Sequence, residues 1–166
     1  MTLINVTLDN NRSLPPPTSP TTNSRSGAIF IRNAATLIME DCRVTNNSAV
    51  FSAGAISSTV PGDNAKLFMD RCVVSGNQSP NGGGGMVIFG DTVSIVNSLI
   101  TGNQADSGAG LYFGSLLTDS TVNVFIANST IAGLYWMFLS PCDIPCTGYL
   151  LHLHASVTSR DRQLLN

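Results

Sequence analysis

Apolar and polar residues alternate along short stretches of the first 130 residues of the 166-residue chain. Most apolar positions are two residues apart, which is typical of strands with one buried face, and no stretch has the period of an amphipathic helix. Between Met39 and Asn47 one step of three, at Asp41, interrupts this spacing. A bend at that point would reset which face of the chain points inward. The pattern therefore predicts an all-β protein made of short strands and corners.

The same short pattern returns along the chain. Each copy ends in an asparagine with an apolar residue three positions earlier, and these asparagines are Asn11, Asn47, Asn77 and Asn103. Successive asparagines are 36, 30 and 26 residues apart, and a fifth copy has Leu134 in this position. A column of mostly small residues also recurs, comprising Cys42, Cys72, Ser98 and Ser129. Self-similarity at a period of about 20–50 residues indicates a repeat architecture.

A second motif opens with glycine and lies between the copies, at Gly27, Gly54, Gly85 and Gly110. Glycine and asparagine both tolerate the backbone conformations of tight corners, so we expect these residues at corners. The column that follows each glycine and the next column are both mostly apolar, which leaves open which of them faces the core. Residues 14–26 are rich in proline, serine and threonine, and this predicted loop insertion explains the long first interval.

Three strands per copy, with corners between them, predict a right-handed parallel β-helix (a solenoid) of about five rungs over residues 1–133. Neighbouring rungs would stack about 4.8 Å apart, and their asparagine side chains could form a hydrogen-bonded ladder. A leucine-rich repeat is the alternative, because Cys42, Val44 and Asn47 mimic its core motif. That fold needs leucines at a rigid period of about 20–29 residues, which this chain does not have.

These motifs resemble the repeats of chlamydial polymorphic outer-membrane proteins and the wider right-handed β-helix repeat families. Gly27-Ala28-Ile29 and Gly54-Ala55-Ile56 match part of the Gly-Gly-Ala-Ile motif of those repeats, and Gly84-Gly85-Met86-Val87 keeps both glycines. The second family motif has phenylalanine three residues before asparagine, where this chain has valine or isoleucine. The resemblance implies a secreted or cell-surface protein that is often adhesive, and it supplies no catalytic residues.

Composition narrows the classes of function. Only 11% of residues are charged, the net charge is −2, and the eight basic residues are scattered. We therefore expect neither nucleic acid nor an anionic membrane surface as a partner. No signal-peptide pattern opens the chain, and the longest apolar run, residues 131–139, is too short to span a bilayer as a helix. No cofactor is expected.

Carboxylates are the first candidates for chemistry. Glu40 and Asp70 occupy equivalent positions in neighbouring copies, and Lys66 and Arg71 lie near Asp70. Two carboxylates beside a base are the minimum that glycoside chemistry needs. A solvated outer face with alternating charge is the favoured interpretation, so no catalytic residue is assigned.

Cysteine and histidine give two further candidates. For Cys42 and Cys72 we favour stacked buried thiols over a disulfide, because neighbours in register point their Cβ atoms the same way. A serine at position 72 is then expected to cost about 1–2 kcal/mol through a partly unsatisfied hydroxyl. Cys142, Cys146, His152 and His154 lie close in sequence but fit no zinc-finger spacing. Incidental residues or one local disulfide are favoured, and no metal site is assigned.

Several N-x-S/T sequons are candidate N-glycosylation sites of a eukaryotic secretory protein. They begin at Asn5, Asn11, Asn46, Asn77 and Asn128. Such patterns also arise by chance in any repeat rich in asparagine, serine and threonine. Asn11 and Asn77 would be poor acceptors if they form a buried ladder, which leaves Asn5, Asn46 and Asn128 as candidates.

The two ends of the chain differ from the repeats. Met1 falls inside a copy with no polar cap before it, and residues 134–166 are predicted to be a non-repetitive tail, either a cap or an artefactual extension that is loosely packed or disordered. We expect a piece of a larger extracellular or cell-surface protein. Its predicted function is that of a non-catalytic structural or adhesive module, with cell-surface proteins or glycans as partners. The alternative is a fragment of a β-helical polysaccharide lyase or hydrolase.

Overall fold

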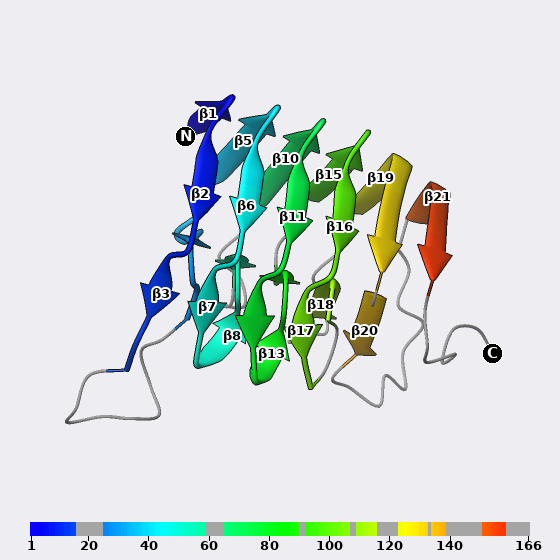
Figure 1. Ribbon diagram of the computed structural model, residues 1–166. Coiled ribbons are helices and arrows are strands. Elements are labelled where there is room, and N and C mark those ends of the chain that lie inside the picture. Colours follow the sequence, from blue (N-terminus) through cyan, green and yellow to red (C-terminus); the bar gives the residue numbers. More distant parts are fainter. Residues whose placement is uncertain are drawn as a thin grey trace.

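The computed structural model of the chain is all-β, as the sequence predicts, and its strands pair in parallel (Figure 1). The structure describes residues 1–15, 25–58, 65–89, 92–106, 109–115, 123–132, 134–138 and 151–158. Within these ranges there is no helix, and hence none long and apolar enough to cross a membrane. Parallel pairing joins segments that are about one repeat apart in sequence, so most contacts in the fold are long-range.

The largest sheet has ten strands in the order β1-β5-β10-β15-β19-β16-β11-β6-β2, with β21 paired to β19. Its strands are β1 (Thr2–Ile4), β2 (Thr7–Asp9), β5 (Thr36–Glu40), β6 (Arg43–Thr45), β10 (Lys66–Asp70), β11 (Val73–Ser75), β15 (Thr92–Val96), β16 (Leu99–Thr101), β19 (Asn123–Ala132) and β21 (Leu151–Thr158). Strand β19 joins two halves of this sheet, because its first part pairs with β15 and its second part with β16. Figure 1 shows the two halves as two stacks of strands, one behind the other.

Three smaller sheets complete the described part of the chain. A four-stranded sheet has the order β17-β12-β7-β3 and contains β3 (Arg12–Ser13), β7 (Ser48–Ala49), β12 (Gln78–Ser79) and β17 (Gln104–Ala105). A two-stranded sheet pairs β8 (Phe51–Ala53) with β13 (Asn81–Gly83). A five-stranded sheet has the order β20-β18-β14-β9-β4 and contains β4 (Ile29–Phe30), β9 (Ile56–Ser58), β14 (Met86–Ile88), β18 (Leu111–Ser115) and β20 (Leu134–Phe138).

We call each successive passage through these sheets a repeat, so that β5 to β9 form the second repeat and β10 to β14 the third. Two corners in each of the first four repeats have a positive φ, and among the described residues the fifth repeat has the first of these corners. The first corner precedes the small-residue column and is formed by Asn5, Asp41, Arg71, Asn97 and Asn128, with φ between 48° and 54°. The second corner precedes the asparagine column and is formed by Asn10, Asn46, Gly76 and Gly102, with φ between 54° and 66°. The bend predicted at Asp41 is therefore present, and most of the other corners carry asparagine or glycine, which tolerate this conformation best.

One hydrophobic core collects inward side chains from the large sheet and from the five-stranded sheet. The apolar positions stack in register, as in the column of Leu3, Met39, Met69, Ile95 and Ile126. Met39 and Ile95 are fully buried, whereas Leu3 of the first repeat is only partly buried. Each fully buried side chain of this size contributes about 1.5–3 kcal/mol, so the aligned columns supply the main driving force for stacking the repeats.

The glycine motif has a different register from the one that the sequence suggested. Ile56 pairs with Met86, and Met86 with Leu111, so Gly54 lies opposite Gly84 and not opposite Gly85. Gly85 in turn lies opposite Gly110. Met86 and Leu111 thereby join Ile56 in the core, and Val87 and Tyr112 of the next column are buried in a second, smaller cluster with Ala53. A run of four glycines, residues 82–85, precedes Met86, and glycines offer no side chain that could fix the alignment in the sequence.

Part of the predicted non-repetitive tail continues the sheets. Strand β20 follows β19 after one residue and pairs with β18, with Leu134 opposite Leu111. Strand β21 pairs with β19, with Leu151 opposite Val124, and a register shift lies between Ala127 and Thr130. The chain therefore goes from the large sheet directly to the five-stranded sheet at Leu134, where the asparagine column ends.

Candidate functional site

The asparagine column forms a ladder of hydrogen bonds that links four repeats. The oxygen Oδ1 of Asn77 accepts hydrogen bonds from the backbone N–H and from Nδ2 of Asn47, both at 2.9 Å. Asn103 Oδ1 accepts the same pair of bonds from Asn77, at 3.0 and 2.9 Å. Asn47 Oδ1 accepts them from Asn11, at 2.9 and 2.8 Å. Each asparagine oxygen thus binds two donors of the preceding repeat.

The ladder amides also donate to backbone carbonyls of the preceding repeat. Asn77 Nδ2 donates to the carbonyl of Val44 at 2.9 Å, and Asn103 Nδ2 donates to the carbonyl of Val74 at 3.0 Å. Asn47 and Asn77 are fully buried, and Asn103 is 9% exposed. A buried amide without partners would be costly, but these amides satisfy one another. The ladder therefore fixes the register between repeats where apolar side chains alone would permit sliding.

The small-residue column forms a second ladder at the first corner. The hydroxyl of Ser98 donates to the carbonyl of Val96 at 2.7 Å and accepts a hydrogen bond from the backbone N–H of Cys72 at 3.0 Å. The hydroxyl of Ser129 accepts one from the N–H of Ser98 at 3.0 Å. A serine in this column therefore has both a donor and an acceptor partner. The partly unsatisfied hydroxyl that we expected from the sequence is not found at Ser98.

Cys42 and Cys72 occupy the same column as free, buried thiols. Each thiol lies within hydrogen-bonding distance of the carbonyl two residues earlier, at 3.2 Å for Cys42 and 3.3 Å for Cys72. Burial raises the pKa of the Cys72 thiol to about 11. A thiol with this pKa is almost wholly protonated at neutral pH, so the column suits packing better than nucleophilic or redox chemistry.

Glycines of the second motif lie where neighbouring repeats approach most closely. A Cβ atom built on Gly54 would lie 2.2 Å from the carbonyl oxygen of Gly84, and one on Gly27 would lie 1.9 Å from that of Gly54. A Cβ on Gly85 would lie 2.3 Å from the oxygen of Gly110. These glycines do not have a positive φ, so the sequence identified them for the wrong physical reason. Glycine is needed at these positions because the backbones of successive repeats approach so closely that they leave no room for a Cβ atom.

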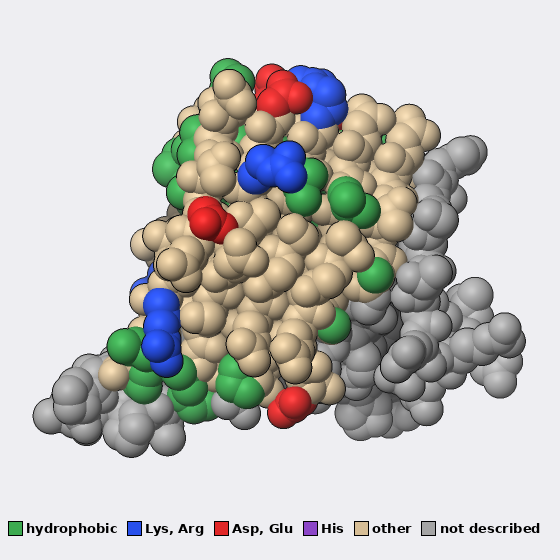
Figure 2. Space-filling model, in the orientation of Figure 1, with side chains coloured by type: hydrophobic (Ala, Val, Ile, Leu, Met, Phe, Trp, Pro, Cys, Tyr) green, Lys and Arg blue, Asp and Glu red, His purple; other side chains and the backbone are tan. Residues whose placement is uncertain are grey.

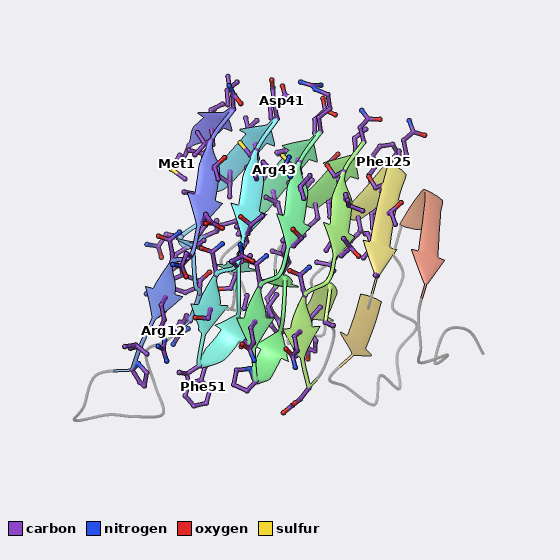
Figure 3. All side chains as sticks on the ribbon, viewed as in Figure 1. Met1, Arg12, Asp41, Arg43, Phe51 and Phe125 are labelled. Carbon is purple, nitrogen blue, oxygen red and sulfur yellow. The ribbon has the colours of Figure 1, made fainter. Side chains whose placement is uncertain are left out.

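Asp41, Asp70 and Arg71 lie together at the first corner, whereas Lys66 lies at the other end of β10 (Figure 3 labels Asp41). Arg71 donates to both oxygens of the Asp41 carboxylate, at 2.8 and 2.9 Å, and also to Asp70. Asn97 Nδ2 donates to the other Asp70 oxygen at 2.8 Å. The hydrogen bonds from Arg71 lower the pKa of Asp41, and the two acids raise the pKa of Arg71. Glu40 and Asp70 lie opposite each other on β5 and β10. The Asp70 carboxylate, however, is hydrogen-bonded to Arg71 and Asn97.

The outer surface over β2, β6, β11 and β16 is polar but has few charged side chains (Figure 2). One outward column contains Asp9, Thr45, Ser75 and Thr101 in register. Asp9 accepts hydrogen bonds from the hydroxyl of Thr45 at 2.6 Å and from Asn46 at 2.9 Å, and both bonds lower its pKa. In the next column Arg43, which Figure 3 labels, lies opposite Val73. This surface, called the front face below, presents hydroxyl groups at the repeat spacing beside the apolar side chains of Val73 and Leu99.

The remaining predicted sites are placed as follows. Asn5, Asn46 and Asn128 are exposed corner residues. His152 and His154 lie on β21, whereas Cys142 and Cys146 lie outside the described residues. The loop insertion of residues 14–26 also lies largely outside them. Among the side chains that the structure describes, no group of three or more His, Cys, Asp and Glu residues could hold a metal ion.

Comparisons with known proteins add no relative from which a function could be inferred. No family model matches the chain, and searches of curated proteins and of solved structures gave no match.

Proposed function

We propose that the chain is part of a right-handed parallel β-helix that serves as a non-catalytic structural and adhesive module of a secreted or cell-surface protein. Its resemblance to polymorphic outer-membrane repeats is part of the same proposal. The asparagine ladder is the observation that carries it. The recurring polar side chains of the core bind neighbouring repeats and hold a stack together, and they do not converge on a substrate.

The paired charges at the first corner also support a structural role. A glycosidase needs one carboxylic acid whose pKa is raised, so that it is protonated when it meets the leaving group. The pKa of Asp41 is shifted in the opposite direction by Arg71. Asp70 accepts hydrogen bonds on both oxygens. An Arg71 that links two neighbouring repeats in this way stabilises the corner.

The front face supports the adhesive part of the proposal. Short parallel strands in register make a regular surface, and its outward columns carry hydroxyl groups, the charges of Asp9 and Arg43, and the apolar side chains of Val73 and Leu99. The hydroxyl and charged groups can hydrogen-bond to the hydroxyls of a glycan or to polar groups of a protein. Cell-surface glycans or proteins are the proposed partners.

The experiment measures binding and turnover on the same purified chain. Binding is measured on an array of immobilised cell-surface glycans and matrix proteins, for the wild type, for Thr45→Lys on the front face and for Lys66→Glu on the other half of the large sheet. We expect saturable binding that Thr45→Lys weakens at least tenfold and Lys66→Glu leaves unchanged. Equal binding of all three chains would contradict the assignment to the front face.

Turnover is measured with pectin-like and other acidic polysaccharides, which are the substrates that the alternative function predicts. We expect no product from the wild type. Product that disappears in Asp70→Ala, with the fold intact by circular dichroism, would establish the alternative polysaccharide-active enzyme and overturn the proposal.

A further inference from the structure

The sequons fall into two groups with opposite orientations relative to the core. In the first group the asparagine is a corner residue with a positive φ, and the group consists of Asn5, Asn46 and Asn128. In the second group the asparagine belongs to the buried ladder, and the group consists of Asn11 and Asn77. Because side chains alternate along a strand, the hydroxyl residue at the third sequon position lies on the same side as the asparagine.

We propose that Asn5, Asn46 and Asn128 accept N-linked glycans and that the folded protein carries none on Asn11 or Asn77. The proposal rests on the extracellular location that the proposed function assumes. In the transfer, Nδ2 of asparagine loses a proton and bonds to the anomeric carbon of an oligosaccharide. The bond from that carbon to a lipid-linked pyrophosphate breaks, and the lipid pyrophosphate is the leaving group.

The outward group has the exposure that a glycan needs. The side chains of Asn5, Asn46 and Asn128 are exposed, and so are the third-position residues Thr7 and Thr130. The middle residue of each sequon points inward instead, as the buried Asn47 and Ser129 show. A sugar attached at these corners would therefore extend into solvent without displacing a core side chain.

The hydrogen bonds of the outward group are also compatible with a glycan. A glycosylated asparagine keeps one hydrogen on Nδ2. Asn46 Nδ2 donates one hydrogen bond, to Asp9 at 2.9 Å, which the remaining hydrogen can still make. Asn128 Nδ2 makes one long contact, at 3.4 Å, with Asn97. Gly76, at the equivalent corner of the next repeat, has no side chain that would crowd Asn46. A Cβ atom at that position would lie only 2.6 Å from Asn46 Oδ1.

In the inward group Asn77 lacks both exposure and a spare hydrogen, whereas Asn11 is exposed but has no spare hydrogen. Asn77 and Ser79, the first and third residues of one sequon, are both fully buried. Both hydrogens of Asn77 Nδ2 are used, by Val44 and by Asn103. Asn11 is more exposed, but its Nδ2 donates to Asn47 Oδ1 at 2.8 Å and to the carbonyl of Asp9 at 3.3 Å. A sugar on Asn77 would displace the core and break the ladder.

The test expresses the full chain behind a secretion leader in a eukaryotic cell line that makes N-linked glycans. Both secreted chains and chains retained in the cell are collected, so that glycosylation can be measured even if the protein is not secreted. Both samples are treated with protease, which removes unfolded molecules. A glycosidase that leaves aspartate at each modified position is followed by peptide mass spectrometry. We expect aspartate at positions 5, 46 and 128, and unmodified asparagine at 11 and 77.

Matched variants remove one sequon each and keep every asparagine. Thr7→Ala, Ser48→Ala and Thr130→Ala should each remove one glycan, whereas Ser79→Ala should remove none. A glycan on Asn11 or Asn77 in protease-resistant chains, or no glycan on any of the three corner asparagines, would overturn the proposal. Because the added leader supplies the route, this result is independent of the binding and turnover assays, which use unglycosylated protein and test the proposed function.

Discussion

Replacing Asn77 by alanine tests the asparagine ladder at its centre. The substitution removes the oxygen that accepts two hydrogen bonds from Asn47 and the amide that donates to Val44 and to Asn103. The buried N–H of Asn47 then has no side-chain acceptor in the next repeat. At the same time a small cavity opens between repeats that are otherwise closely packed.

The expected loss follows from these contacts. A typical hydrogen bond contributes about 1 kcal/mol net, and a buried group left without a partner costs about 1–3 kcal/mol. For a fully buried amide that bonds to both neighbouring repeats, we expect Asn77→Ala to lower the free energy of unfolding by about 3–5 kcal/mol. That is a large fraction of the roughly 5–15 kcal/mol that stabilises a typical domain.

Urea denaturation followed by circular dichroism measures this loss, and Asn11→Ala is the matched control. Asn11 is exposed and its side chain bonds to the ladder on one side only, so its replacement should cost about 0.5–1.5 kcal/mol. A double-mutant cycle between Asn47 and Asn77 should give a coupling of about 0.5–3 kcal/mol, because the two residues share hydrogen bonds. Equal costs for Asn11→Ala and Asn77→Ala, or a loss below about 1 kcal/mol at Asn77, would show that the ladder does not hold the repeats together.

Three other changes test the remaining parts of the site. Cys72→Ser should change the free energy of unfolding by less than about 1 kcal/mol, because Ser98 shows that a hydroxyl in this column finds partners; a loss of 2 kcal/mol or more in urea denaturation would contradict this. Ser79→Ala should stabilise the protein by up to about 1 kcal/mol in the same assay, since its buried hydroxyl has no hydrogen-bond partner among the described residues. Because Arg71 lowers the pKa of Asp41, this pair contributes stability that is present above the unfolded pKa of about 3.9 and is lost as the pH falls through the lower folded value. Acid titration of the melting temperature should therefore be less steep in Asp41→Asn, and identical acid profiles would refute the pairing.

Local patterns in the sequence were sufficient for the strands and for the corner at Asp41. Alternation with a period of two marks a half-buried strand, and a step of three in that alternation marks a point where the inward face is reset. The asparagine column could also be found, since a side chain that bonds to its own equivalent must recur with the repeat. The strands and the corner depend on residues close together in the chain, and the asparagine column is visible because it recurs once in each copy of the motif.

The register of the glycine motif, the bonding of Ser98 and the last two strands depend on contacts between repeats. The glycine motif could not be aligned from the sequence, because residues 82–85 have no side chains to distinguish one register from the next, and only the packing of Met86 above Ile56 selects it. The donor to the Ser98 hydroxyl, the backbone N–H of Cys72, comes from the neighbouring repeat, so no local pattern predicts that bond. Strands β20 and β21 lack the repeat motif and are strands because the edges of β18 and β19 offer them hydrogen bonds. The sequence by itself determined which residues alternate and turn, and the tertiary structure decided which of them meet, because parallel pairing joins residues that are 23 to 36 positions apart, as in Leu111 with Leu134 and Thr2 with Ile38.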